Sequence, residues 1–179
     1  MKHICSPTTK SVLYNVIDGD AGPNACDIRL SRVFGFVQDS VCILSETVKQ
    51  HRETYEIYPN EDLFWTLQPG TYEILMDNMV VIEDKESGFV MVRSTLNRNG
   101  VFITSGLYDS GYGIDVASGE YTKGTMAGAL HVTGGPLMIQ KGTRVGQFIL
   151  FDAETRELYD GSYGSHKEHD QMKYVTSNV

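Results

Sequence analysis

Two arginines and two hydroxyl side chains lie within six residues of each other, directly after a stretch that is typical of a β-strand. They are Arg93, Ser94, Thr95 and Arg98, and Gly100 follows them. A guanidinium is a planar fork of N–H donors, hydroxyls are adaptable donors, and glycine lets the backbone approach a ligand closely. The segment therefore suits a polyphosphate, although a polar turn with solvated arginines fits the residues equally well.

A carboxylate precedes an aromatic ring by three residues in the next glycine-rich loop, at 106–113. Asp109 can hold or deprotonate a water molecule. The ring of Tyr112 can lie against a sugar and disfavour one that carries an extra, unpaired hydroxyl. Taken alone this is a weak indication, because aspartate beside serine and glycine forms turns more often than catalytic sites.

An arginine and an amide side chain lie three residues apart in a late strand candidate. They are Arg144 and Gln147, preceded by Gly142. Side chains three apart point to opposite faces of an extended strand. One can therefore form a structural pair while the other reaches a ligand, and the residue types do not decide which.

Short strands must position these segments, because β-branched and aromatic runs alternate with glycine and proline turns along most of the chain. The pattern predicts an all-β jelly roll or barrel and argues against a parallel α/β sheet. Residues 6–9 predict the cap of a short N-terminal helix that runs toward Val16. The predicted strands are Cys26–Phe36, 63–66, 72–76, 79–82, 89–92, Val101–Thr104, 129–133, Leu137–Gln140 and 145–151.

Composition limits the classes of function. The 179 residues predict one domain, 1–179, and the net charge of −8 argues against a nucleic-acid partner. Three cysteines without CxxC spacing indicate neither a disulfide framework nor a zinc site. No apolar run approaches the roughly 18 residues of a membrane span, so we expect a cytoplasmic protein without membrane contact. The polar tail at 159–179 is a candidate for a mobile closing arm, although fraying is the commoner fate of such tails.

Several segments, taken in their order along the chain, resemble the sequence patterns of one family. Residues 93–100 resemble the pattern R-S-S-L-x-R-x-G, residues 104–112 resemble T-A-x-x-I-D-P-G-F, and residues 142–147 resemble G-x-R-I-G-Q. Residues 25–30, 67–72 and 159–163 are similar to V-D-V-R-L, L-x-P-G-E-x and Y-x-G-K-Y. Over roughly residues 24–164 the chain thus resembles the dCTP deaminases and, more distantly, the trimeric dUTPases. Several matches that occur in the same order as in the family are far more specific for it than any one match alone.

The resemblance implies a distorted β jelly roll, the dUTPase-like β-clip, in a homotrimer whose active sites lie between subunits. It also implies that dUTP or dCTP binds together with Mg²⁺, which is held mainly through the substrate phosphates. We therefore expect no metal site built from protein side chains.

Two reactions occur in such proteins, deamination of the cytosine ring and cleavage between the α- and β-phosphates of dUTP. The deaminases carry a proton-shuttling glutamate on the strand after the I-D-P-G-F segment. The corresponding residues 128–133 contain no carboxylate here, and an insertion at about 114–123 interrupts the pattern. Glu120, within that insertion, is the displaced glutamate if the chain is a deaminase. His131 on the strand is more often packed or hydrogen-bonded than catalytic.

The favoured interpretation is a dUTP diphosphatase, which forms dUMP and pyrophosphate. The resemblance then implies that Asp109 holds the attacking water, that the Tyr112 ring lies against the deoxyribose, and that Arg98 offsets charge on the leaving group. The expected substrate-binding residues are Arg93, Ser94, Thr95, Thr104, Tyr112, Gln147 and Tyr163.

Three alternatives stay open. The chain is a dCTP deaminase, with both reactions in one protein as a variant of that alternative. Its specificity has moved to a modified pyrimidine, because the insertion lies beside the pocket that should contact the base. It is a nucleotide-binding regulator without turnover, because the glycine-rich C-terminal arm of typical dUTPases is missing.

Overall fold

The structure is a computed structural model that describes residues 1–175 of the chain. Its strands are β1 (Val12–Tyr14), β2 (Cys26–Phe36), β3 (Ile43–Leu44), β4 (Lys49–Gln50), β5 (Thr54–Ile57), β6 (Phe64–Leu67), β7 (Gly70–Val81), β8 (Glu86–Val92), β9 (Val101–Thr104), β10 (Gly124–Val132), β11 (Leu137–Gln140) and β12 (Arg144–Asp152). The helices are α1 (Ser94–Arg98) and α2 (Glu168–Asp170), and a π-helical turn (Gln171–Val175) follows α2. Within residues 1–175 no helix is long and apolar enough to cross a membrane.

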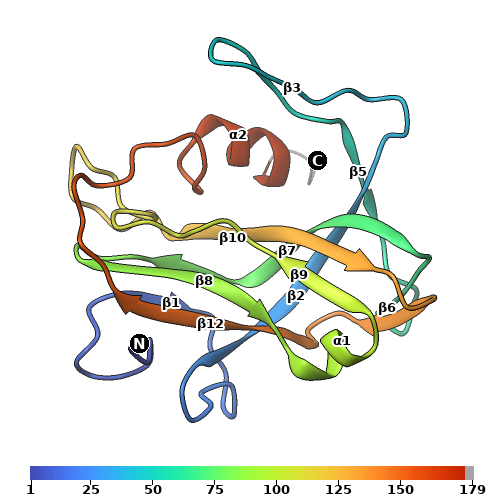
Figure 1. Ribbon diagram of the computed structural model, residues 1–179, viewed down its shortest axis with the longest axis horizontal. Coiled ribbons are helices and arrows are strands. Elements are labelled where there is room, and N and C mark those ends of the chain that lie inside the picture. Colours follow the sequence, from blue (N-terminus) through green and yellow to red (C-terminus); the bar gives the residue numbers. More distant parts are fainter. Residues whose placement is uncertain (176–179) are drawn as a thin grey trace.

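Antiparallel pairing joins most strands into one curled sheet (Figure 1). The order is β8-β12-β2-β7-β10-β9, with β1 added on β7 and β5 added on β2. The two ends of this order, β8 and β9, lie next to each other, and Tyr108 pairs with Gly88 of β8 just beyond β9. The sheet is therefore nearly closed, and the predicted all-β, jelly-roll-like fold is confirmed.

Alternating residues of the long strands fill the interior of this curled sheet. Ile28 and Leu30 of β2, Ile74 of β7, and Phe148 and Leu150 of β12 are all fully buried or nearly so. Side chains of a strand point alternately to its two faces, so the residues between them point outward. Two-residue periodicity thus fixes both the core and the outer face on which a pocket is built.

The predicted short N-terminal helix is wrong. Turns and bends occupy most of residues 6–11, and Val12–Tyr14 forms β1, which pairs with the end of β7. Ser11, which lies just before β1, donates its backbone N–H and its hydroxyl to buried Glu86, at 2.9 and 2.6 Å. A local cap cannot compete with a strand ladder and a buried carboxylate that lies 75 residues away in sequence.

The predicted break between strands 72–76 and 79–82 does not occur. Asn78 and its neighbour Asp77 suggest a turn, yet β7 runs continuously from Gly70 to Val81. The Asn78 side chain is fully buried, accepts a hydrogen bond from the Arg29 N–H at 2.9 Å and donates to the Tyr14 carbonyl at 3.1 Å. Its amide is therefore satisfied by neighbouring strands instead of by a turn.

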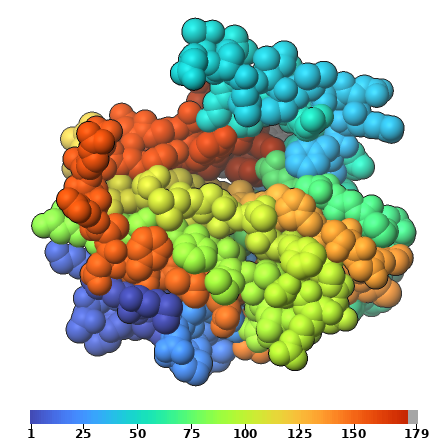
Figure 2. Space-filling view, in the orientation of Figure 1, coloured from blue at the N-terminus to red at the C-terminus, as the bar shows by residue number. Residues whose placement is uncertain are grey.

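Two segments cover the outer face of β7 and β10. Figure 1 shows α2 above β10, and the hairpin of β3 and β4 projecting beyond it. Figure 2 shows this hairpin lying over the C-terminal segment, which we define as residues 159–174. Lys49 places its ammonium 4.2 Å from the ring centre of Tyr163, and the His51 and His169 rings are 4.4 Å apart.

Candidate active site

The loop after β9 is a tight, glycine-dependent turn. Gly111 has a φ of +92°, and a β-carbon there would lie 2.8 Å from the backbone nitrogen of Tyr159. The Tyr112 N–H donates to the Asp109 carbonyl at 3.0 Å. The rings of Tyr108 and Tyr112 meet edge to face with their centres 5.2 Å apart. Backbone geometry therefore holds the predicted aspartate and tyrosine in one turn.

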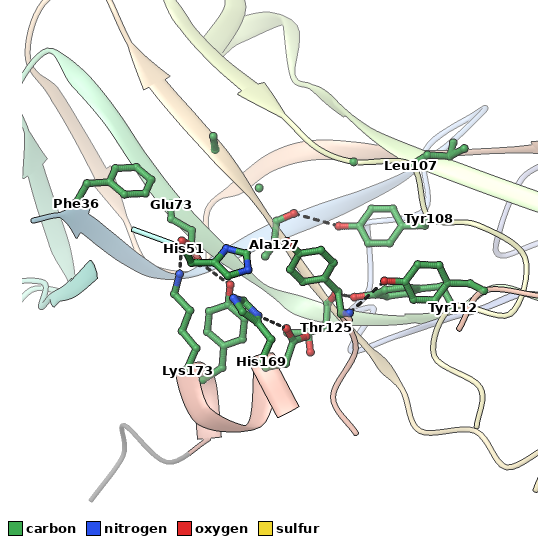
Figure 3. Close-up of a pocket in the computed structure, with 17 residues that line it drawn as sticks. Phe36, His51, Glu73, Leu107, Tyr108, Tyr112, Thr125, Ala127, His169 and Lys173 are labelled. Atoms are coloured by element: carbon green, nitrogen blue, oxygen red, sulfur yellow. Dashed lines mark hydrogen bonds and ion pairs between the residues drawn. The ribbon is translucent and has the colours of Figure 1, made fainter. Parts of the chain in front are cut away.

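A cavity of about 460 Å³ lies between the outer face of β10, this loop and the C-terminal segment (Figure 3). Its volume falls in the range of small-molecule sites, which is about 300–1,000 Å³. We call it the tyrosine pocket, because five tyrosines line it: Tyr108, Tyr112, Tyr159, Tyr163 and Tyr174. It can enclose a flat ring between aromatic and aliphatic walls.

Tyr112 lies in the wall of this pocket, where the sequence analysis expected a sugar platform. The residue is 7% exposed, and its hydroxyl donates to the Thr125 carbonyl at 2.6 Å. Burial raises the pKa of this hydroxyl well above its usual value. The phenol is therefore neutral and acts as a fixed apolar surface.

Asp109 is exposed and does not line the tyrosine pocket. It lines a second cavity, together with Ser110, Phe151 and residues 153–161. Leu107 and Tyr159 line both cavities, so they form the wall between them. The predicted water-holding carboxylate and the predicted sugar platform thus lie on two sides of one wall.

The arginine-rich segment meets a buried carboxylate from β2. Asp27, 5% exposed, forms ion pairs with Arg93 and, at 3.4 Å, with Arg144. Both arginines bind the same oxygen, and the other carboxylate oxygen of Asp27 has no hydrogen-bond partner among the described atoms. Arg144 is therefore a structural partner of Asp27. Gln147 is half-buried in β12 and pairs in register with Asp27.

The remaining phosphate-binding candidates lie on α1. Ser94, Thr95 and Arg98 are exposed on this five-residue helix. Their donors face solvent, so they are accessible to an anionic ligand.

One chain does not bring Asp109 to these donors. Tyr108, the neighbour of Asp109, pairs with Gly88 of β8, and Arg93 lies five residues after Gly88, just past the end of β8. At about 3.3 Å per strand residue, this is a separation of about 17 Å. The predicted water site and the predicted phosphate site therefore lie toward opposite ends of β8.

Two further candidates do not line the tyrosine pocket. Thr104 bonds to His131 at 3.0 Å, and the other ring nitrogen of His131 bonds to Thr71 at 3.2 Å. His131 is thus hydrogen-bonded between two threonines. Glu120 is exposed in the inserted loop, and it lines neither of the two cavities.

Sequence reasoning missed the charged lining of the tyrosine pocket. It consists of Glu73, Asp170 and Lys173, with His51 and His169 beside them. Burial, followed by the neighbouring His169, lowers the pKa of His51, so this ring is neutral near pH 7. Of these residues, only Glu73 could have been found from the sequence. Ile74 and Met76 are apolar residues of a predicted strand and point inward, so an alternating strand must present residue 73 outward.

No group of three or more His, Cys, Asp or Glu side chains within residues 1–175 can hold a metal ion. This donor set does not form a cage of protein side chains for a cation.

Comparisons with known proteins agree with the fold. A probable deoxyuridine 5'-triphosphate nucleotidohydrolase of Halobacterium salinarum is 34% identical over 98 residues, which are 55% of this chain and 53% of that protein, so the match spans about half of its length. The deoxyuridine 5'-triphosphate nucleotidohydrolase of Methanocaldococcus jannaschii is 24% identical over 158 residues, 87% of this chain and 94% of that protein.

Among solved structures, the 2'-deoxycytidine 5'-triphosphate deaminase of Agrobacterium tumefaciens has a TM-score of 0.56 at 14% identity. The alignment covers 79% of this chain and 43% of the deaminase chain, and this likeness shows the fold alone. The model of the family described as dCTP deaminase-like matches residues 7–153. Because this match spans most of the 179 residues, the chain belongs to the dCTP deaminase-like family.

Proposed function

We propose that this protein is a dUTP diphosphatase, which hydrolyses dUTP to dUMP and pyrophosphate. One observation carries the proposal: β10 presents only Thr125, Ala127, Gly128 and Ala129 to the tyrosine pocket, so the strand lacks the carboxylate that a deaminase of this type needs. The names of the two archaeal relatives, both dUTP nucleotidohydrolases, support the same choice.

The roles follow from exposure and position. The exposed carboxylate of Asp109 can hold a water molecule and accept its proton. The water oxygen then bonds to the α-phosphorus, the bond between this phosphorus and the bridging oxygen breaks, and pyrophosphate leaves. Tyr112 supports the deoxyribose, and Tyr163 of the C-terminal segment closes the pocket. The donors at 93–98, with Thr104 and Gln147 as further substrate contacts, offset the charge of the phosphates.

The proposed assembly is a homotrimer with its active sites between subunits. The separation of about 17 Å between Arg93 and Gly88, which pairs with the neighbour of Asp109, supports this assembly, at about 3.3 Å per strand residue. A neighbouring copy can supply Arg93, Ser94 and Arg98 to the nucleotide that Asp109 serves. The proposal includes a cytoplasmic location and no nucleic-acid partner, because a net charge of −8 disfavours contact with a phosphate backbone.

Mg²⁺ is the proposed cofactor. It would supply positive charge to the triphosphate, and its ligands would be mainly phosphate oxygens and water, with the exposed carboxylate of Asp109 as a further ligand. The part of the closing-arm prediction that covers residues 176–179 lies outside the described residues. Residues 159–174 form one wall of the tyrosine pocket, and we propose that they move aside when a nucleotide enters.

A second candidate function is dCTP deamination. The carboxylate of Glu73 lines the tyrosine pocket from β7, so an acidic group is present there although β10 provides none. In a deaminase it would move protons between water and the cytosine ring.

The test is turnover of dUTP and dCTP, with pyrophosphate and ammonia measured separately. Asp109→Asn should reduce pyrophosphate release from dUTP at least about a thousandfold and keep nucleotide affinity within about tenfold, because it removes a base and no phosphate contact. Asp84→Asn is the matched control, since Asp84 is exposed and lines neither cavity. Normal turnover by Asp109→Asn would contradict the assigned role.

Subunit mixing tests the shared site. Asp109→Asn and Arg98→Ala chains should each be inactive alone and should recover part of the activity when they are mixed, because some sites then receive both native residues. Unchanged inactivity after confirmed subunit exchange would contradict a site that is built from two chains.

A further inference from the structure

Asp27 lies on the outer face of the sheet, beside residues that are proposed to bind the phosphates. In the register of β12 on β2 it stands opposite Gln147, and the register of β12 on β8 sets Gln147 opposite Met91, two residues before Arg93. Paired residues share one face of a sheet, and every second residue of a strand returns to that face. Both sequence neighbours of Asp27 are fully buried in the core. The side chains of Asp27, Gln147 and Arg93 therefore lie on the same outer face.

The Asp27 carboxylate holds the guanidinium of Arg93. An N–H of Arg93 donates to one Asp27 oxygen, and the Arg93 side chain is 31% exposed. The backbone N–H of Arg93 donates to the Val145 carbonyl at 3.0 Å, so the residue is fixed at its backbone as well as at its charged end. Among the described residues, Asp27 is the one hydrogen-bond acceptor of this guanidinium. Most of its five N–H donors therefore remain for a ligand.

Two guanidiniums share this single carboxylate. Arg144 places its guanidinium 3.4 Å from the oxygen that Arg93 also contacts, and the Arg144 side chain is 43% exposed. The other Asp27 oxygen is buried and has no partner among the described atoms. Two positive charges and one negative charge leave one net positive charge in this cluster. Such an excess at a partly exposed site favours an anionic ligand.

A second buried carboxylate of the same region pairs with an arginine in a different way. Asp20 is fully buried, and its two oxygens accept from two nitrogens of Arg29, at 2.5 and 3.0 Å. A third nitrogen of Arg29 donates to the Gly142 carbonyl at 2.8 Å. Asp20 thus forms a two-point structural pair whose donors are used within the protein. Asp27 instead holds its arginine at one point and leaves the other donors outward.

We propose that Asp27 is a positioning residue of the phosphate site, which holds the Arg93 guanidinium so that its remaining donors face the triphosphate. A side chain that is already held loses little conformational freedom when the ligand binds, whereas a free arginine loses much more. The planar fork must also be oriented correctly to make two parallel bonds to a phosphate. Asp27 itself does not touch the nucleotide. The inference rests on the proposed dUTP site and adds the residue that orients its arginine.

Removal of the Asp27 charge separates positioning from a simple charge effect. Asp27→Asn keeps the size of the side chain and removes its negative charge. If that charge only weakened the field of the two arginines, the variant would bind a triphosphate more tightly. If the charge positions Arg93, the variant binds a triphosphate more weakly, because the hydrogen bonds of a charged donor to the phosphates are lost.

Titration calorimetry with two ligands, in buffer that contains Mg²⁺, measures the effect without turnover. One ligand is α,β-imido-dUTP, in which an N–H replaces the oxygen between the α- and β-phosphorus atoms and prevents hydrolysis there. The other is dUMP. The readout is the ratio of the two affinities, because damage to the fold or to the base and sugar contacts lowers both.

Asp27→Asn and Arg93→Gln should each lower the native ratio at least about fivefold, in favour of dUMP, the expected loss for a hydrogen bond to a charged group. The double variant should keep the ratio of the weaker single variant to within about twofold. The two losses do not add, because Asp27 acts through Arg93.

Asp20→Asn is the matched control. It removes the charge of an equally buried carboxylate whose arginine lies outside the proposed site, so its ratio should stay within about twofold of the native one. Thermal melting shows which variants fold. If Asp27→Asn does not fold, Asp27→Glu replaces it, because the longer side chain keeps the charge and displaces its oxygens by one methylene. Positioning then predicts the same fall of at least about fivefold, and a simple charge effect predicts none.

Three results would overturn the inference. They are a ratio that rises, or falls less than about fivefold, in the folded Asp27 variant, a fall of more than about twofold in Asp20→Asn, and a double variant more than about twofold below the weaker single variant. The last result would show that Asp27 acts independently of Arg93. Failure of the proposed function would be seen separately, as a native protein that binds the imido analogue but releases no pyrophosphate from dUTP.

Discussion

Glu86→Ala should destabilise the fold far more than loss of an exposed carboxylate. Glu86 begins β8 and is 1% exposed. One of its oxygens accepts from the Ser11 backbone N–H at 2.9 Å and from the Ser11 hydroxyl at 2.6 Å, and the other accepts from the Lys2 ammonium at 2.7 Å. These bonds attach the residues before β1 to the sheet.

The size of this destabilisation follows from the hydrogen-bond donors of Ser11 that lose their acceptor. Ser11 is 3% exposed, so alanine at position 86 leaves two buried donors without an acceptor. Each costs about 1–3 kcal/mol, and together they lower the free energy of unfolding by about 2–5 kcal/mol, since water recovers part of the loss. For a chain of this size, about 2–4 °C per kcal/mol predicts a melting temperature lower by roughly 4–20 °C.

Circular dichroism melting of Glu86→Ala and of the exposed control Glu61→Ala measures the effect. The control should stay within about 2 °C of the native protein, because surface substitutions change stability little. A Glu86→Ala protein that melts within the same 2 °C would refute the claim that this buried carboxylate organises the N-terminal residues.

The contribution of Glu86 to the stability of the fold should change with pH in a definite direction. Burial acts to raise the pKa of Glu86, but the hydrogen bonds from Lys2 and Ser11 together outweigh it, and the pKa lies below the usual 4.5. A folded-state pKa below the unfolded one gives stability that is complete above the unfolded value and is lost as the pH falls through the folded value. The native melting temperature should therefore fall on acidification below about pH 4.5, and the Glu86→Gln protein should show a smaller fall.

Two further predictions concern the pocket. Gly111→Ala should destabilise the protein by about 1–3 kcal/mol and expose the C-terminal segment to protease, because φ is +92° and the new β-carbon meets Tyr159 and Leu158 at under 3 Å. Gly119→Ala, at a φ of +75° with nothing within 4 Å, should cost only about 1 kcal/mol, and equal losses in melting experiments would contradict the packing explanation. Chelation of Mg²⁺ should stop pyrophosphate release from dUTP and leave dUMP affinity unchanged in calorimetry, since the cation is held through the outer phosphates, whereas loss of dUMP binding would place the cation elsewhere.

Strand periodicity and turn residues were sufficient to predict most of the sheet. The bounds of β2, β9 and β11 agree with the predicted strands, because their inward residues alternate with outward ones, and Gly100 and Pro136 mark where β9 and β11 begin. The N-terminal helix and the break in β7 were wrong for one common reason. Ser11 and Asn78 satisfy their polar groups with residues that are distant in sequence, and local propensity contains no information about those partners.

The candidate site, too, was predicted only in part from the sequence. The sequence identified the arginine-rich segment, Asp109 and Tyr112 as residues of chemical interest. The structure decided that Arg144 pairs with Asp27, because the register of β12 on β2 sets Arg144 opposite Arg29, two residues along β2 from Asp27. It also showed that a wall separates Asp109 from the pocket that contains Tyr112.

The residue types, their alternation along the strands and the order of the matching segments were enough to predict an all-β chain of the dCTP deaminase-like family, and they named the loops whose residues could do chemistry. Only the tertiary structure decided that Glu73 and Lys173, 100 residues apart in sequence, meet at one end of a pocket. The physical reason is that a side chain's direction follows from the two-residue period of its own strand, whereas its neighbours across space follow from strand register and from where the chain's end packs.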